Sequence, residues 1–421
     1  MGHETIHLKG GRIICPESGT DRVGDLWISG GLIADQPASD AREIDCTGLV
    51  ICPGFTDLGA ELCDPGKVWR EDLTSGSEAG AAGGFTTIVA SPRTDPVVDG
   101  PVTVSDILRR CAGLTGARVE LAGALTIGLD GVQMSEIGLM VEAGVVALSD
   151  GRRTMMNAAL LRRALDYSRP FGVPVFLRPG NTDLEGAGVM HEGEVSTRIG
   201  LRGIPSAAEE IGVATALALA EVSGAHVHLS QVTTAGSVEI LRSGKARGVR
   251  ISAAAPARNL WLSDVDVEAS VYSTSMRLLP PLRADADVRA LRSAVADGTV
   301  DCITADHVPM MSLEKELEFM HAKPGAMGLE TALSAALTAI EDPALVISAL
   351  AVAPARVIGR TADLRTGSVA DVVLFDPTAR RVVSGPFRSK GLNEPLLGRE
   401  LRGRVIATIR DGCIIYGPHT E

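Results

Sequence analysis

The sequence is poor in aromatic residues, and it lacks the excess of positive charge that is typical of nucleic-acid-binding proteins. Phe, Trp and Tyr together make up 3% of the 421 residues, and the formal net charge is −12. Stacking platforms for bases need aromatic side chains, and binding to phosphate backbones needs clustered Lys and Arg. We therefore expect no nucleic-acid partner.

Cysteine pairs and long apolar runs are missing as well. The seven cysteines, at positions 15, 46, 52, 63, 111, 302 and 413, show no C-x-x-C spacing, which argues against a disulfide framework and a thiolate zinc site. We expect mostly buried thiols. No apolar run reaches membrane-spanning length, and the N-terminal stretch has no basic region followed by an apolar one. These absences predict a cytoplasmic protein that does not bind membranes.

The middle of the chain alternates short apolar runs with amphipathic segments. "GFTTIVASP" precedes "VTVSDILRRCAGL", "VELAGALTI" precedes "MSEIGLMVEAG", and the alternation continues to "VDCITADHV". About eight strand and helix repeats of this kind predict an α/β protein with a (β/α)₈ TIM barrel. We assign residues 54–361 to this barrel.

Both ends of the chain differ from the middle, because Gly and Pro punctuate short strand-like runs there. Examples are "TIHLKGGRIICPESG" near the start and "GRVIATIRDGCIIYG" near the end. Chain ends often lie close together. We therefore predict that residues 1–53 and 362–421 together build one small β-sandwich domain.

Long segments of the chain resemble the dihydroorotases, which belong to the cyclic amidohydrolase superfamily. They include "EDLTSGSEAGAAGGFTTIVASPRTDP", "GVMHEGEVSTRIGLRGIPSAAEEI" and "DGTVDCITADHVP", and the resemblance extends over essentially the whole chain. It implies an amidohydrolase-type barrel. In that family, one or two zinc ions held by His and carboxylate ligands activate a water molecule, which opens or closes a cyclic amide.

The residues at the corresponding strand ends differ from the family's ligands. The family's D-x-H-x-H-x-R motif matches Asp57, Gly59, Glu61 and Cys63, so both histidines and the arginine are replaced. No set of three protein ligands is apparent, and we expect neither a bound metal nor another cofactor. By this resemblance, the former metal positions are Gly59, Glu61, Gly151, Arg178, Gln231 and Asp306, the last being the retained general-base position, and the former substrate positions are Cys63, Arg93, Leu279 and Met310.

Two arginines, Arg93 and Arg178, stand at altered positions and would repel a cation. Either they pair with Asp150, Glu61 or Asp306, or they form a new anion pocket.

His226 and His228 share one strand face, which could indicate a two-histidine site. We favour the alternative that they are hydrogen-bonded polar residues at a strand end.

From the resemblance and the lost ligands we expect a non-catalytic dihydroorotase-like protein of pyrimidine biosynthesis. Its expected role is structural, as an assembly partner of aspartate transcarbamoylase, and a homodimer or larger complex is expected. One alternative is an active dihydroorotase with a degenerate site, which interconverts dihydroorotate and carbamoyl aspartate. Another is a sensor of an anionic pyrimidine intermediate. A hydantoinase or allantoinase is less favoured, because those enzymes also need the missing histidines.

Overall fold

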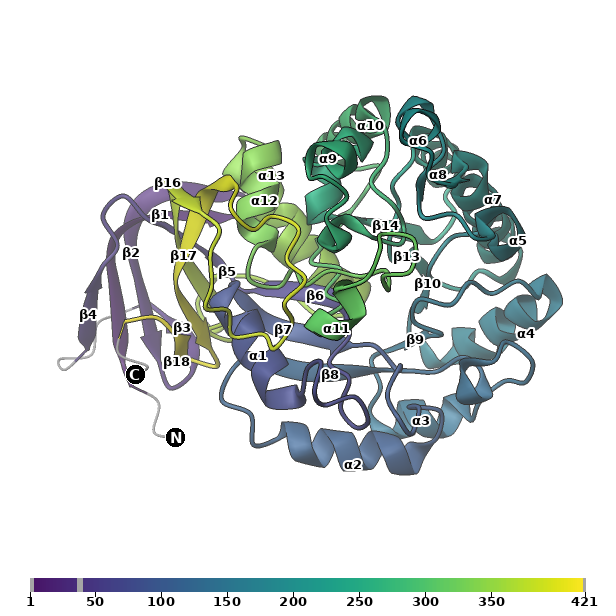
Figure 1. The fold of residues 1–421 in the computed structure, drawn as a ribbon. Coiled ribbons are helices and arrows are strands. Elements are labelled where there is room, and N and C mark those ends of the chain that lie inside the picture. Colours follow the sequence, from purple (N-terminus) through teal and green to yellow (C-terminus); the bar gives the residue numbers. More distant parts are fainter. Residues whose placement is uncertain (1–3, 36–40, 419–421) are drawn as a thin grey trace.

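The computed structural model describes residues 4–35 and 41–418, and it contains a parallel barrel beside an antiparallel sheet (Figure 1). The predicted (β/α)₈ barrel is confirmed: eight strands follow one another as neighbours in chain order, with helices on the outside. The barrel strands are β6 (Phe55–Ala60), β7 (Phe85–Ala90), β8 (Arg118–Gly123), β9 (Ala147–Ser149), β10 (Val175–Leu177), β13 (Val227–Leu229), β14 (Ile251–Pro256) and β15 (Cys302–Thr304).

Amphipathic helices connect these strands, and local sequence signals set their ends. The Asp72 side chain caps the first barrel helix by accepting a hydrogen bond from the Ser75 amide at 2.7 Å. Gly144 ends another in the left-handed conformation that glycine adopts easily. The longer helices are α1 (Leu73–Ala82), α2 (Pro101–Cys111), α3 (Ile137–Ala143), α4 (Ala158–Ser168), α7 (Ser206–Ser223), α8 (Ala235–Ala246), α10 (Asp285–Ala296) and α12 (Ala332–Ala339).

Short elements fill the connections at the barrel rim and before the last part of the chain. They are α5 (Thr182–Glu185), α6 (Glu194–Ile199), α9 (Asp264–Ala269), α11 (Ser312–Lys315), α13 (Pro343–Ile347), α14 (Ala353–Val357) and the two-residue strands β11 (Met190–His191) and β12 (Gly203–Ile204).

The chain ends form a second sheet of eight strands with its own buried core. The predicted second β unit, built from both chain ends, is therefore confirmed, and its strands are joined in one hydrogen-bonded sheet. The division at residues 53 and 362 stays a prediction. The strands are β1 (Ile6–Cys15), β2 (Thr20–Ser29), β3 (Leu32–Ala34), β4 (Arg42–Asp45), β5 (Val50–Pro53), β16 (Val372–Val382), β17 (Glu400–Arg410) and β18 (Cys413–Tyr416).

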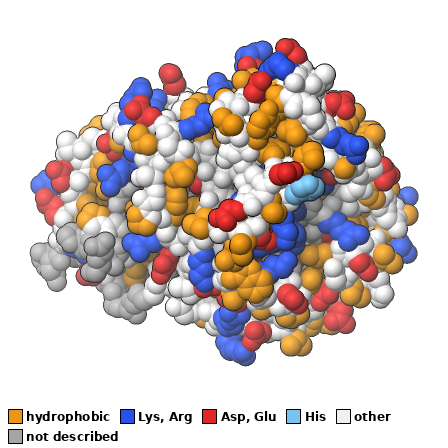
Figure 2. Space-filling view, viewed as in Figure 1, with side chains coloured by type: hydrophobic (Ala, Val, Ile, Leu, Met, Phe, Trp, Pro, Cys, Tyr) orange, Lys and Arg blue, Asp and Glu red, His pale blue; other side chains and the backbone are white. Residues whose placement is uncertain are grey.

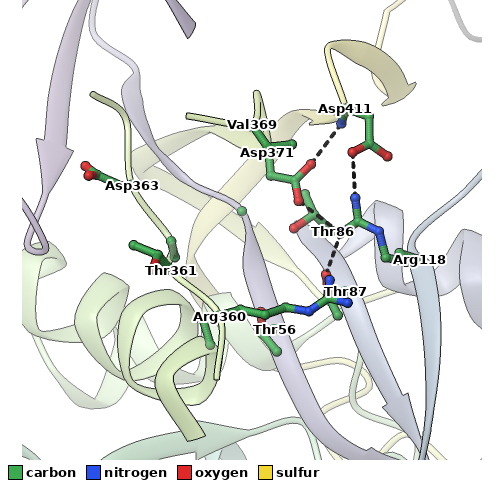
Figure 3. A pocket seen from close by; sticks show the side chains of 13 residues that line it. Thr56, Thr86, Thr87, Arg118, Arg360, Thr361, Asp363, Val369, Asp371 and Asp411 are labelled. Atoms are coloured by element: carbon green, nitrogen blue, oxygen red, sulfur yellow. Dashed lines mark hydrogen bonds and ion pairs between the residues drawn. The ribbon is translucent and has the colours of Figure 1, made fainter. Parts of the chain in front are cut away.

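Arg118, the first residue of β8, links the barrel to this sheet. Its guanidinium binds Asp371 at 3.2 Å and Asp411 at 2.6 Å, beside a pocket of about 390 Å³ that Thr86 and Thr87 also line (Figure 3). Because these barrel residues lie at the amino ends of their strands, the sheet contacts the end of the barrel opposite the carboxyl ends. The contact therefore leaves the other end, where TIM barrels carry their sites, open.

The interior of the barrel is packed with small and medium-sized side chains. The cluster takes one residue from each of seven barrel strands, among them Leu58, Val89 and Phe176. His228 of the remaining strand, β13, contacts the Phe176 ring, with 5.1 Å between ring centroids. The barrel centre is thus a solid core, and the space for chemistry lies above it.

Asp57 in β6 closes the barrel seam against β15. Its Oδ1 accepts hydrogen bonds from the Thr304 hydroxyl at 2.9 Å and from the Ala305 amide at 2.7 Å, and the Glu61 amide donates to the His307 carbonyl nearby. Burial raises the pKa of Asp57, and the two accepted hydrogen bonds act in the opposite direction. The first Asp of the D-x-H-x-H-x-R pattern is therefore retained in a structural position.

Five of the seven cysteines are buried, as predicted, and Cys111 and Cys413 are half-buried. In the part of the chain that the structure describes, no helix combines the length and apolarity needed to cross a bilayer.

Replacing Asp57 with Ala should destabilise the protein by about 2–4 kcal/mol, because it leaves two buried donors without an acceptor. Asp57→Asn keeps one acceptor oxygen and should cost less. Urea unfolding at neutral pH measures both, with Asp106→Ala on the exposed side of α2 as the control. If the Ala variant lost no more stability than this control, Asp57 would not hold the seam.

Candidate functional site

A cavity of about 810 Å³ lies at the carboxyl ends of the barrel strands. Three of the four predicted substrate positions, Arg93, Leu279 and Met310, line it. The fourth, Cys63, is buried beside Glu61, whose carbonyl lies 3.9 Å from its Sγ. Lys and Arg side chains gather beside α11 in the middle of the face viewed in Figure 1, as Figure 2 shows.

Basic side chains predominate in the cavity wall. The nearby carboxylates of Glu61, Asp306 and Glu314 pair with several of them, and with these included the cavity retains one more basic than acidic group. The whole chain has a formal net charge of −12, so the positive charge of this cavity contrasts with the rest of the protein. Its basic lining residues are Lys67, Arg70, Arg93, Arg152, Arg153 and Lys323, and the acidic ones are Asp130 and Asp150.

Asp306 lies at the floor of this region between two guanidinium groups. Its Oδ1 accepts hydrogen bonds from Arg152 Nη1 at 2.6 Å and from Gln231 Nε2 at 3.0 Å, and its Oδ2 accepts one from Arg258 Nη1 at 2.9 Å. The backbone of Asp306 has φ +45°, a left-handed conformation that is unusual for a residue other than glycine. The surrounding bonds therefore fix both the backbone and the carboxylate.

Arg258 is a fully engaged, buried cation. Its Nη2 donates to the carbonyls of Ala305 at 2.7 Å, Asp306 at 3.0 Å and Met327 at 3.1 Å. Gly328 leaves the necessary room, because a Cβ at that position would lie 2.5 Å from this nitrogen. Arg258 is therefore a permanent part of the floor.

Arg93 occupies the space above Gly151 and pairs with Glu61. A Cβ at position 151 would lie 2.6 Å from Arg93 Cδ. The missing side chain at 151 and the arginine at 93 thus fit each other sterically. For Arg93, this confirms the expected pairing with one of the three carboxylates, Glu61.

Arg178 does not pair with Asp150, Glu61 or Asp306, and this part of the expectation is wrong. It binds Glu185 with Nη1 at 2.9 Å, and it donates to the Thr154 hydroxyl at 2.6 Å and to the Arg152 carbonyl at 2.7 Å. Glu185, seven residues further along the chain in α5, brings its carboxylate to the Arg178 guanidinium instead. Arg178 therefore holds the segment that carries Arg152.

Asp150 binds the loop after β8 with its carboxylate. Its carboxylate accepts hydrogen bonds from the amides of Leu125 at 2.9 Å and Thr126 at 3.0 Å, and from the Thr126 hydroxyl at 2.6 Å. Burial raises its pKa, and these bonds act in the opposite direction. Asp150 thus fixes the loop after β8.

The residues at the family's metal positions do not fit a zinc centre. Across residues 4–35 and 41–418, no group of three or more His, Cys, Asp or Glu side chains is placed to hold a metal ion. Asp306 is flanked by Arg152 and Arg258, and Gln231 turns its NH₂ group towards it. Gly59 has φ +154°, a conformation that a histidine would rarely adopt.

His226 and His228 are hydrogen-bonded to a neighbouring strand, in keeping with the favoured alternative. His226 Nε2 and His228 Nδ1 both lie 2.9 Å from the Ser252 hydroxyl oxygen. Burial, together with the nearby His226, lowers the pKa of His228 to about 3. Both rings therefore stay neutral inside the barrel at neutral pH.

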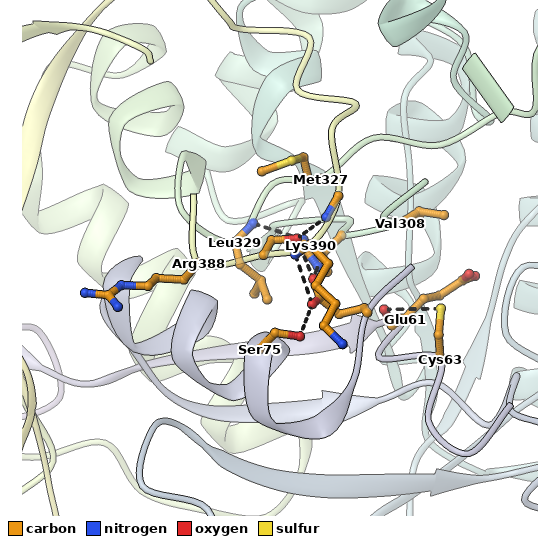
Figure 4. A network of polar contacts seen from close by, with 12 residues as sticks. Glu61, Cys63, Ser75, Val308, Met327, Leu329, Arg388 and Lys390 are labelled. Carbon is orange, nitrogen blue, oxygen red and sulfur yellow. Dashed lines mark hydrogen bonds and ion pairs between the residues drawn. The ribbon is translucent and has the colours of Figure 1, made fainter. Parts of the chain in front are cut away.

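A second buried network ties the rim of the mouth to the C-terminal part of the chain. The Glu71 carboxylate accepts hydrogen bonds from Ser75, Ser389, the Lys390 amide and His307 Nε2, the last at 3.1 Å (Figure 4). His307 follows Asp306 directly. Through Glu71, the segment around Ser389 is thus linked to the residues that follow β15.

Comparison with known proteins identifies the family. A family model of "Dihydro-orotase-like" proteins matches residues 48–237. The curated dihydroorotase of Anaeromyxobacter dehalogenans (strain 2CP-1) is 42% identical to the chain and that of Citrifermentans bemidjiense 38%, with 97–98% of this chain and 98–99% of theirs covered. The chain belongs to the dihydroorotase family.

Solved structures of related enzymes share the fold. The L-hydantoinase of Arthrobacter aurescens superposes with a TM-score of 0.86 at 21% identity, covering 98% of this chain and 96% of the other. The dihydropyrimidinase of Brevibacillus agri gives 0.84 at 20% identity, covering 98% of this chain and 95% of its own. The amidohydrolase type of the predicted barrel is confirmed.

These comparisons contradict the expectation of a non-catalytic assembly partner. Relatives that match this dihydroorotase-family chain over almost their full length are named dihydroorotase. The expectation rested on the missing zinc ligands alone, and changed ligands by themselves do not determine whether a barrel mouth can bind and convert a substrate.

Sequence reasoning placed Asp306, Glu61 and Arg93 at the mouth but missed the partners of Asp306. Arg152 in "DGRR" and Arg258 in "PARN" were assigned no role from the sequence. The available signal was that both arginines lie within three residues of the carboxyl end of a barrel strand, where side chains converge on the mouth.

Replacing Arg258 with Met should destabilise this dihydroorotase-family protein by about 3–5 kcal/mol, because it removes one partner of a buried ion pair. Arg242→Met removes exposed pairs with Glu239 and Asp297 and should cost less than about 1 kcal/mol. Urea unfolding measures both. Equal losses would contradict a structural role for Arg258.

The buried, neutral His228 should make the protein less stable in mild acid. Its pKa is about 3 in the folded chain and 6.5 ordinarily, so its stabilising contribution is complete above pH 6.5 and is lost as the pH falls towards 3. Between pH 7 and pH 5 the loss should be about 2 kcal/mol. Urea unfolding of His228→Gln should show a smaller pH dependence than the parent, and an unchanged dependence would contradict this.

Proposed function

We propose that the chain is a dihydroorotase-type cyclic amidohydrolase, which interconverts dihydroorotate and carbamoyl aspartate. The observation that supports this most is the 42% identity, over 98% of both chains, to a curated dihydroorotase. The position of the cavity agrees with it, because TIM-barrel enzymes carry out their chemistry at the carboxyl ends of the strands.

The charge of the cavity suits these substrates. Dihydroorotate carries one carboxylate and carbamoyl aspartate carries two, and both would enter a cavity with six basic lining residues. Electrostatic attraction of this kind concentrates anions at a cleft. The cavity is also large enough for a molecule of this size, since small-molecule sites commonly span about 300–1,000 Å³.

Ring opening adds water to the amide carbonyl, breaks the C–N bond and returns a proton to the ring nitrogen. In this proposal Asp306 accepts the proton of the attacking water, because it is the carboxylate at the family's general-base position. Arg152, which lines the cavity, stabilises the negative charge that develops on the carbonyl oxygen. No step is assigned to a metal, since the present residues do not form its site.

Purified protein should hydrolyse dihydroorotate and, in the reverse direction, cyclise carbamoyl aspartate. Asp306→Asn should lower the rate by about 100-fold or more, because the proton acceptor is lost. Absorbance of dihydroorotate in both directions measures the rate.

The control is Asp106→Asn, which alters an exposed carboxylate on α2 and should retain the parent rate. Each protein is assayed as purified and after chelation. Absence of turnover in both directions would refute the proposed activity.

A second candidate function is the binding of an anionic pyrimidine intermediate as a signal. It is favoured by the combination of a basic cavity with unsuitable metal positions. Binding of carbamoyl aspartate without turnover would support it.

Association with aspartate transcarbamoylase, a homodimer or larger complex, and a cytoplasmic location also stay predictions. Size-exclusion chromatography of the chain alone and mixed with that enzyme tests the first two.

A further inference from the structure

We propose that the barrel mouth is an anion site anchored by Arg152 and closed to divalent cations by the cluster of Arg152, Asp306 and Arg258. The expected ligand is a small dianionic carboxylate. The choice of carbamoyl aspartate as the probe rests on the proposed function, but the binding mode does not.

The cluster carries more positive than negative charge. Asp306 is flanked by Arg152 and Arg258, at 2.6 and 2.9 Å. A divalent cation next to this carboxylate would face two guanidinium groups at close range, and such repulsion is strong where water is largely excluded. Arg258 cannot swing away without breaking three bonds to buried carbonyls.

Arg152 has a donor to spare. Nη1 binds Asp306, whereas Nη2 is buried and has no hydrogen-bond partner among the residues that the structure describes. A buried donor without an acceptor is costly, and native proteins usually satisfy such a group with protein, water or ligand. Because Arg152 lines the cavity, an anionic oxygen of a ligand is the natural acceptor.

The arginine is held ready for this contact. Arg178 donates to the Arg152 carbonyl at 2.7 Å and binds Thr154 at 2.6 Å, so the segment after β9 is fixed on both sides of Arg153. A donor that is already positioned loses little conformational entropy when a ligand binds.

Further positive groups stand around Arg152. Arg153 and Lys67 line the same cavity, and Arg93 reaches over Gly151 beside them. Burial and the neighbouring Arg277 and Arg258 lower the pKa of Lys315 to about 7, in keeping with a positive potential at the mouth. Two carboxylates of one ligand could therefore both meet cations.

Isothermal titration of the full chain with carbamoyl aspartate tests the proposal, with the neutral ring compound dihydrouracil as the comparison ligand. We expect carbamoyl aspartate to bind with the same Kd in chelator and in added zinc, and dihydrouracil not to bind. A Kd that requires zinc, or equal binding of the neutral compound, would overturn the proposal.

Two variants should change the affinity in opposite directions. Arg152→Met should weaken binding about tenfold or more, because a charge-assisted hydrogen bond is lost. Asp306→Asn should strengthen it severalfold, because it removes the negative charge that competes for Arg152. At a metal-dependent site, Asp306→Asn would instead abolish binding.

Arg356→Met, which removes an exposed pair with Glu17, is the matched control and should bind like the parent. Arg152→Lys is the second variant, to be used if the Met variant does not fold. Its Kd for carbamoyl aspartate should lie between those of the parent and of Arg152→Met. Unchanged affinity in the Arg152 variants would overturn the proposal even if the enzyme turned over. Loss of turnover with this binding pattern intact would refute the proposed activity alone.

Discussion

The ion pairs of Asp306 with Arg152 and Arg258 determine what the rest of the barrel mouth can do. They place two cations at 2.6 and 2.9 Å from one buried carboxylate, at a position where the sequence resemblance implied a metal ligand. The neighbouring changes are consistent with this arrangement. Gln231 presents a donor to the same carboxylate, Gly328 leaves room for Arg258, and Arg178 holds the backbone of Arg152. The residues at the barrel mouth are thus linked to one another through Asp306 and its two arginines.

This arrangement leaves the framework of the family unchanged. The barrel, the sheet from the chain ends and the full-length match to curated dihydroorotases all persist around an altered centre. The difference from the family pattern therefore concerns how the charge of the Asp306 carboxylate is compensated. The carboxylate of Asp306 is compensated by two guanidinium groups, which keep their charge at every physiological pH.

The barrel could be predicted from the sequence because its alternation of strands and helices is a local pattern that repeats. The contact of Arg93 with Glu61 was among the pairings that the sequence suggested, because both residues follow the carboxyl ends of neighbouring strands, β6 and β7. The partner of Arg178 could not be predicted, because Glu185 lies in a short helix whose direction depends on tertiary packing. The same holds for Arg258, whose role depends on carbonyls that two separate segments, 305–306 and 327, bring together.

The Glu71 network has a consequence for how the protein is made. Ser389 and Lys390 donate to a carboxylate that also binds His307, the residue next to Asp306. The ribosome delivers these two donors more than 300 residues after Glu71. Until then the Glu71 carboxylate lacks two of its hydrogen-bond donors, so the mouth of the nascent barrel stays unfinished while most of its strands have already emerged. Completion of the site is thereby tied to completion of the polypeptide.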